Sequence, residues 1–120
     1  MKPKAYDRNR AEELLPLLSA ITREIEEREE SIGRLDEMIR ALSISPKVHG
    51  DEIANLQAES AIQKRELRYA LKELEDLGCE VDSSLPLTIR IPGLSGDVKR
   101  GFAWRPGDES LRLHSADHAA

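Results

Sequence analysis

Basic side chains recur in the C-terminal third of the chain, where the sequence alternates with the period of a strand. Side chains two apart on a strand share a face, so several of these residues are expected on one side of a sheet. Guanidinium groups bind carboxylates and phosphates through paired hydrogen bonds. The pattern predicts a candidate site for an anionic ligand, or for an acidic partner, that comprises Trp104, Arg105, Arg112, His114 and Arg90, with Lys99 nearby. The alternative is an ordinary solvated face whose charges prevent edge-to-edge aggregation.

Other reactive residue types lack a recognisable context. The spacing of His114, Asp117 and His118 matches no well-defined zinc site, and no metal or other cofactor is expected. Cys79 follows a predicted helix end, where the helix dipole raises a thiol pKa, so we interpret it as a packing residue. No catalytic constellation is recognised, and the sequence leaves open whether the chain is an enzyme.

Two helical segments precede this region. Apolar side chains recur at alternating spacings of three and four from Leu14 to Leu42, and again from Ile53 to Leu77. This spacing is typical of a coiled-coil seam. Because the connection over Ser43–Gly50 is short, the two helices are expected to pack antiparallel.

Local signals predict where these helices begin and end. Asp7 is a candidate N-cap, with Tyr6 packing on Ala11 as a hydrophobic staple. Pro16 is expected to kink the first helix or to end a short first segment. Asp51 is the expected cap of the second helix, and Gly78 is well placed just past its end.

Three polar residues interrupt the apolar seam. Arg28 breaks the first helix pattern, and Ser60 with Gln63 breaks the second. Antiparallel folding places these interruptions in the middle of the hairpin. They indicate either a weakly packed, partly solvated stretch or a functional polar site.

Three short strands are predicted after the second helix, at residues 87–91, 98–105 and about 111–114. They are expected to form an antiparallel meander with one face packed on the helices. The predicted fold is therefore mainly α with a small β part. Residues 1–78 form a long helical hairpin with helices at about 8–42 and 51–77, and residues 79–120 form a small β module with a flexible tail. The inward face is expected to comprise Leu87, Ile89, Ile91, Val98, Phe102, Trp104, Leu111 and Leu113.

Composition limits the partners that we expect. A net charge of −5 argues against general nucleic-acid binding, which depends on Lys and Arg neutralising phosphates. The polar first ten residues resemble no signal peptide, and no apolar run is long enough to span a bilayer, so a cytoplasmic location away from membranes is expected. Two helices alone leave apolar surface beside their seam exposed. We therefore predict a homodimer that completes a four-helix bundle.

Several segments resemble the prokaryotic family catalogued as domain of unknown function 2203. The matching segments are Glu13-Leu14-Leu15-Pro16-Leu17-Leu18, Leu77-Gly78-Cys79-Glu80-Val81 and Phe102-Ala103-Trp104-Arg105-Pro106-Gly107-Asp108-Glu109. The most telling pieces are Gly78-Cys79-Glu80-Val81 and Trp104-Arg105-Pro106-Gly107. Leu113-His114 is similar to the family's later Trp-His pair, although an aromatic residue is replaced by Leu113 and an acid by Ser115. The resemblance implies a helical hairpin with a β appendage and no established activity. It also draws attention to Arg105 and His114, which packing explains least.

Overall fold

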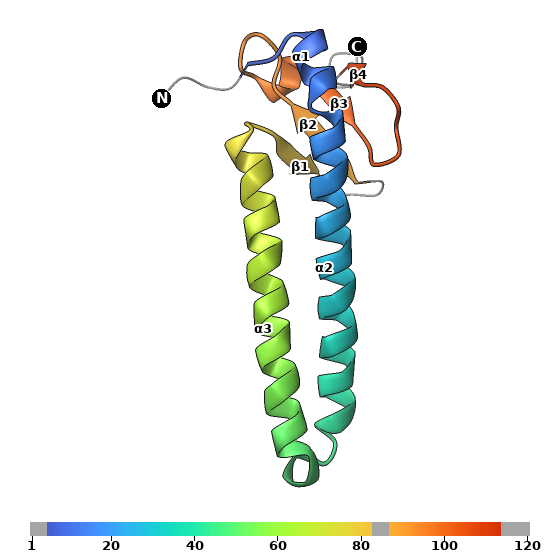
Figure 1. The fold of residues 1–120 in the computed structure, drawn as a ribbon, viewed down its shortest axis with the longest axis vertical. Coiled ribbons are helices and arrows are strands. Elements are labelled where there is room, and N and C mark those ends of the chain that lie inside the picture. Colours follow the sequence, from blue (N-terminus) through green and yellow to red (C-terminus); the bar gives the residue numbers. More distant parts are fainter. Residues whose placement is uncertain (1–4, 83–86, 114–120) are drawn as a thin grey trace. The chain divides into compact units, whose positions relative to one another are not determined.

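The computed structural model describes residues 5–82 and 87–113, except for the side chain of Lys99. The chain is mainly helical, and its two long helices are followed by an antiparallel sheet (Figure 1), which confirms the predicted fold class. The elements are α1 Arg8–Glu13, α2 Leu15–Leu42, α3 Pro46–Asp76, β1 Glu80–Asp82, β2 Thr88–Ile91, the 3₁₀ helix η1 Val98–Arg100, β3 Phe102–Trp104 and β4 Arg112–Leu113.

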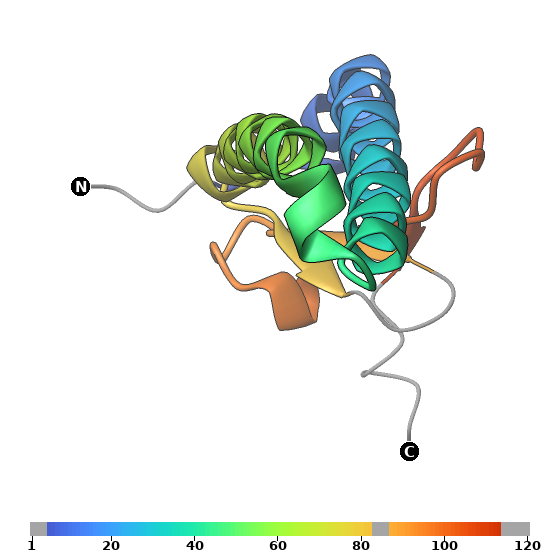
Figure 2. The same cartoon turned by 90° about the horizontal axis from the view of Figure 1, so that it is seen from below.

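The chain divides into two compact units. The sheet unit contains residues 1–22 and 72–120, and the hairpin unit contains residues 23–71. In the hairpin unit the corresponding parts of α2 and α3 run side by side (Figures 1 and 2). Each unit has its own packing.

The first helical segment begins and ends as its residues predict. The Asp7 carboxylate accepts a hydrogen bond of 2.8 Å from the backbone N–H of Arg10, which makes Asp7 the N-cap of α1. α1 ends before Leu14, and α2 begins at Leu15 with Pro16 in its first turn. A proline there costs no helical hydrogen bond, because the N–H groups of a first turn have no partner within the helix. Pro16 thus ends a short first segment, one of the two predicted outcomes.

α3 begins at Pro46, earlier than the expected start at Asp51. The reason is that proline, which stops a helix from inside, is favoured as its first residue. The carbonyl of Ser45 accepts the N–H groups of Val48 and His49 at 3.1 and 3.2 Å, which closes this first turn. His49 then has non-helical dihedral angles (φ −112°, ψ 20°), so a kink separates this turn from the rest of α3. The expected loop over Ser43–Gly50 is therefore mostly helical.

The end of α3 is a Schellman motif built on a glycine. Gly78 has φ +81°, which its missing Cβ allows at little cost. Its N–H donates to the carbonyl of Glu75 at 2.8 Å, and the N–H of Cys79 donates to that of Leu74 at 3.0 Å. These two bonds and the burial of Cys79 and Leu74 are the features of this cap. The predicted role of Gly78 is confirmed.

The sheet unit contains, among the described residues, a meander in the order β1-β2-β3-β4 with every neighbouring pair antiparallel. β1 pairs Val81 with Ile89, and β2 pairs Ile89 with Trp104. β1 was not predicted, because three residues show no alternation and the strand exists through its pairing with β2. The second predicted strand is shorter than expected, since residues 98–100 form η1 and only residues 102–104 pair.

The core of the sheet unit is aliphatic with one indole at its centre. The residues that are at most 8% exposed include Tyr6, Ala11, Leu18, Ile21, Thr22, Leu74, Cys79, Ile89, Ile91, Pro92, Trp104 and Leu111. The Tyr6 hydroxyl donates to the carbonyl of Leu77 at 2.9 Å, which ties the chain start to the end of α3. Ile89, Ile91 and Trp104 lie on the inward face as predicted, whereas Leu113 is 59% exposed. Leu113 lies on β4, which pairs with β3 alone and forms an edge of the sheet.

The segment between β2 and β3 turns back on itself at two glycines. The N–H of Gly96 donates to the carbonyl of Gly93 at 2.9 Å, which closes a turn within residues 92–97. A Cβ on Gly93 would lie 2.5 Å from the carbonyl oxygen of Arg100. A Cβ on Gly101 would meet the carbonyl oxygen of Ile91 and lie 2.7 Å from the nitrogen of Gly93. Backbone atoms therefore occupy the space that a side chain at either position would need, so both positions require glycine.

Candidate functional site

The strand register places two of the predicted site residues on one face of the sheet. Arg90 lies opposite Glu80 on one side and Ala103 on the other, and Ala103 lies opposite Arg112. Residues directly opposite each other on neighbouring strands share a face. Arg90 and Arg112 therefore share the face opposite Ile89 and Trp104, as their sequence parity predicts.

Acidic residues accompany both of these arginines. The guanidinium of Arg90 lies 2.9 Å from Asp82, with both side chains about one-third exposed or less. Arg112 lies 3.3 Å from Asp108, and the Arg112 side chain is more than half exposed. On the sheet face that carries Arg90 and Arg112, both arginines therefore form ion pairs, and the neighbouring carboxylates balance their positive charge.

Trp104 and Arg105 lie beside a tight turn that follows β3. The Trp104 side chain is 2% exposed, and its indole N–H donates to the carbonyl of Asp108 at 2.9 Å. The N–H of Asp108 donates to the carbonyl of Arg105 at 2.9 Å, and the Asp108 carboxylate accepts the N–H of Arg105 at 3.2 Å. Pro106 and Gly107 fill the central positions, and Gly107 has φ +95°, as a type II turn requires.

The Arg105 side chain differs from those of Arg90 and Arg112. Arg105 is half-buried, and among the described residues no carboxylate forms an ion pair with its guanidinium. His114, Asp117 and His118 lie outside the described residues, as does the Lys99 side chain. Within the described part of the chain, no group of three His, Cys, Asp or Glu side chains could hold a metal ion.

Cys79 is part of the core of the sheet unit. Its residue is 6% exposed, and burial raises the pKa of its thiol from 9.0 to about 12. Burial also raises the pKa of Tyr6, as does the charge of Cys79 to a smaller extent, while Arg10 acts in the opposite direction. The Cys79 pKa shift has the predicted direction, but burial, rather than the helix dipole, is its cause.

These shifts predict a loss of stability at alkaline pH. An unfolded Cys79 thiol loses its proton near pH 9, whereas the folded thiol keeps it to about pH 12. The unfolded state therefore binds fewer protons in this interval, so the free energy of unfolding falls as pH rises, by about 1.4 kcal/mol per unit. Denaturant unfolding of the wild type and of Cys79→Ala from pH 8 to 11 measures this term. We expect a shallower decline for Cys79→Ala, and parallel curves would contradict the assignment.

The seam of the hairpin unit is only partly buried. Among its described residues, Ile25, Ser60 and Ala70 are buried. The remaining aliphatic seam positions are half-buried: Ile32, Leu35, Ile39, Leu42, Ile53, Leu56 and Leu67. Several large apolar side chains are more exposed still, including Met38 at 50%, Ile62 at 44% and Tyr69 at 56%. Two helices alone leave much of this apolar surface in water.

The polar seam residues bridge α2 and α3 in the middle of the hairpin unit. Arg28 donates to the side-chain oxygen of Gln63 at 2.9 Å, and its guanidinium lies 2.9 Å from Glu24. The Ser60 hydroxyl donates to Asp36 at 3.3 Å. Partnered polar groups in a seam fix which residues stand opposite each other, because any slip would leave them unpaired. The three interruptions therefore set the register of the hairpin.

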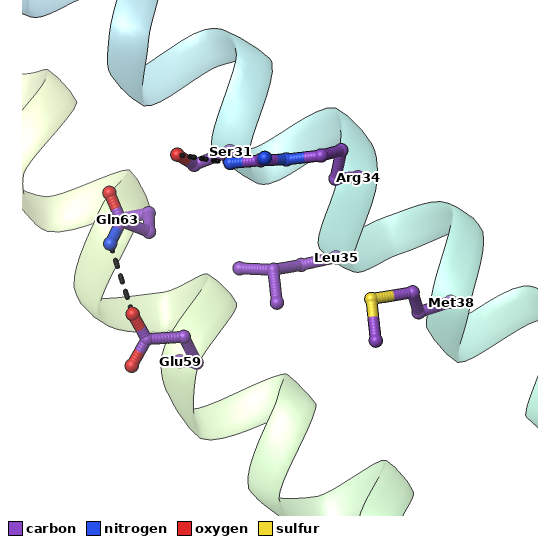
Figure 3. A pocket seen from close by; sticks show the side chains of 6 residues that line it. All are labelled: Ser31, Arg34, Leu35, Met38, Glu59 and Gln63. Carbon is purple, nitrogen blue, oxygen red and sulfur yellow. Dashed lines mark hydrogen bonds between the residues drawn. The ribbon is translucent and has the colours of Figure 1, made fainter.

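A shallow groove lies between α2 and α3 within the hairpin unit (Figure 3). Its volume is about 270 Å³, and its lining residues are Ser31, Arg34, Leu35, Met38, Glu59 and Gln63. Leu35 points across the space between the helices, and Met38 stands one turn further along α2. The Gln63 amide donates to Glu59 at 3.0 Å along the α3 wall. The groove thus has an apolar floor, a cation on one wall and a carboxylate on the other.

This groove was not among the sites predicted from the sequence. The apolar spacing identifies Leu35 as a seam residue, but it assigns no role to Met38, which lies beside the seam. The signal that could have found it is the helical neighbourhood of Met38, which lies one turn from both Leu35 and Arg34. A methionine beside the apolar seam, one helical turn from an arginine, therefore indicates an apolar surface that continues past the seam and ends at a charged residue.

Comparison of the sequence with known proteins identifies one family. No helix in the described part of the chain is both long and apolar enough to cross a membrane. Searches of curated proteins and of solved structures return no match. The family model described as "Uncharacterized conserved protein (DUF2203)" matches residues 4–119, which is nearly the whole chain. The protein therefore belongs to the DUF2203 family of uncharacterised conserved proteins.

Proposed function

We propose that the protein is a structural or protein-interaction module that dimerises through the helices of its hairpin unit. The observation that carries this proposal is the half-buried seam. Its seven half-buried aliphatic positions and the exposed Met38, Ile62 and Tyr69 leave apolar surface on a helix pair that a third and fourth helix would cover. Burying such surface contributes about 25 cal/mol per Å².

A second copy of the hairpin is the simplest cover. Two helical hairpins pack as a four-helix bundle, in which each seam residue is enclosed by neighbours from both copies. A closed two-fold dimer also uses the same surface on each chain, so no second partner surface is needed. The coiled-coil character of the hairpin, the cytoplasmic location, the prokaryotic origin and the lack of nucleic-acid partners stay predictions of the sequence.

Sedimentation equilibrium over a wide concentration range tests this proposal. We expect a mass twice the 13.5 kDa of one chain at micromolar concentration, falling toward the single-chain mass on dilution. Circular dichroism at the same concentrations reports whether the helices are formed. A monomer with fully formed helices at every concentration would overturn the proposal.

Binding of a small anion at Arg105 is the second candidate function. It is favoured by the half-buried residue Arg105, whose guanidinium forms no ion pair with a described carboxylate and whose backbone N–H is bonded to Asp108 in the adjoining turn. A phosphate or carboxylate there could accept paired hydrogen bonds from this group. Arg90, Arg112 and His114 are the other basic residues of the proposed site, with Arg90 and Arg112 each already beside an acid. Trp104 is buried on the opposite face and can contribute only through its hydrogen bond to the turn.

A thermal-shift series distinguishes this second candidate. Phosphates, nucleotides and carboxylates are expected to raise the melting temperature of the wild type and to lose that effect in Arg105→Ala. Arg8→Ala, which removes an exposed arginine from an ion pair on α1, serves as the control and should keep the effect. An unchanged melting temperature with every anion would remove the candidate.

A further inference from the structure

We propose that the groove of Ser31, Arg34, Leu35, Met38, Glu59 and Gln63 receives the same groove of a second copy, about a two-fold axis parallel to the hairpin helices. This inference rests on the proposed dimerisation and adds which face is used and how the copies are oriented. In this arrangement α2 of each copy faces α3 of the other. The apolar floors of the two grooves then close on each other.

The charges on the groove walls are the first argument. Arg34 on α2 is exposed, forms no ion pair with a described residue and donates only a long 3.4 Å hydrogen bond to Ser31. Glu59 on α3 is also exposed. Its only hydrogen bond or ion pair with a described residue is the hydrogen bond from Gln63. One wall therefore presents an uncompensated cation and the other an uncompensated carboxylate, so the groove is complementary to a copy of itself.

The charges on the two groove walls also determine the direction of the two-fold axis. A two-fold axis parallel to the helices exchanges the facing walls, so Arg34 of each copy meets Glu59 of the other. A two-fold axis across the helices would place α2 against α2, with Arg34 against Arg34 and Glu59 against Glu59. Like charges that face each other at an interface are unfavourable. The groove charges therefore select the parallel axis.

The apolar floor supplies the second argument. Leu35 is half-buried and Met38 is half exposed within one chain, and both are apolar residues that line the groove. Methionine adapts its shape to a facing surface because its side chain is long and unbranched. An apolar centre with a polar rim is the usual anatomy of a protein interface.

Charge reversal tests the Arg34–Glu59 contact. Arg34→Glu and Glu59→Arg should each weaken dimerisation roughly 10- to 30-fold, because two attractive contacts become repulsive. A one-to-one mixture of the two variants should regain roughly wild-type affinity, since the copies then pair opposite charges. Arg68→Glu, at an exposed position about 180° around α3 from Glu59, is the control and should leave the affinity unchanged. Single reversals without effect would overturn the proposal.

The distance between hairpin ends tests the axis. A spin label on Lys47→Cys, near the hairpin turn, can be introduced selectively because Cys79 is buried. A parallel axis brings the two labels within about 20 Å, whereas a perpendicular axis separates them by about 35 Å at a helical rise of 1.5 Å per residue. A dimer with the longer distance would overturn the orientation and leave the proposed function intact. A monomer in the sedimentation experiment would remove both.

Discussion

Gly101→Ala is expected to destabilise the sheet unit by about 3 kcal/mol, which is a large part of the stability of a small domain. The new Cβ would meet the carbonyl oxygen of Ile91 and lie 2.7 Å from the nitrogen of Gly93. Both neighbours are backbone atoms, so no side chain can rotate away to relieve the contact. β2 and β3 would have to separate at the end of the pair where Gly101 faces Ile91. Denaturant unfolding followed by fluorescence of Trp104, the chain's single tryptophan, measures the loss.

Gly33→Ala is the matched control. Apart from the backbone of α2 itself, no atom lies within 4 Å of the position where its Cβ would stand, and Gly33 lies inside α2. Alanine there should stabilise the helix by about 0.5–1 kcal/mol, because glycine loses more backbone entropy on folding. The same chemical change therefore has opposite signs at the two positions. Equal effects of the two substitutions would contradict the close backbone approach at Gly101.

Met38→Glu is expected to weaken dimerisation on the order of 100-fold. Within one chain Met38 is 50% exposed, so the substitution should cost the isolated hairpin little. In the proposed dimer the new carboxylate would be buried in the apolar floor of the groove, near Glu59. Sedimentation equilibrium gives the dissociation constant, and circular dichroism shows whether the helices remain formed.

The control for this substitution is Leu94→Glu. Leu94 is 77% exposed and lies in the segment between β2 and β3, so the same change of charge is made outside the hairpin unit. Its dissociation constant should equal that of the wild type. If Met38→Glu dimerises as tightly as Leu94→Glu, the groove is not the surface through which the copies associate.

The helical part of the fold could be predicted because its signals are local. The apolar spacing of three and four, the Asp7 cap and the glycine at position 78 each act within a few residues. Each was confirmed. The expected start of α3 at Asp51 was wrong, because a proline that would stop a helix from inside is favourable as its first residue, as Pro46 is here.

Features that depend on tertiary contacts were harder to predict. β1 consists of three residues whose strand conformation comes from pairing with β2. Arg90 pairs with Asp82 on a different strand. The alternation of residues along one strand therefore predicts that Arg90 and Arg112 share a face, but it does not predict which acidic residues lie beside them. The groove at Met38 likewise arises from two helices together, and no single helix pattern contains it.

Hydrogen exchange of the backbone amides at two protein concentrations tests the central claim most directly. The claim is that a second copy covers the hairpin unit. Amides within residues 23–71 should exchange slowly well above the dissociation constant and much faster well below it, while those of β2 and β3 should change little. Protection of residues 23–71 that does not depend on concentration would contradict the claim.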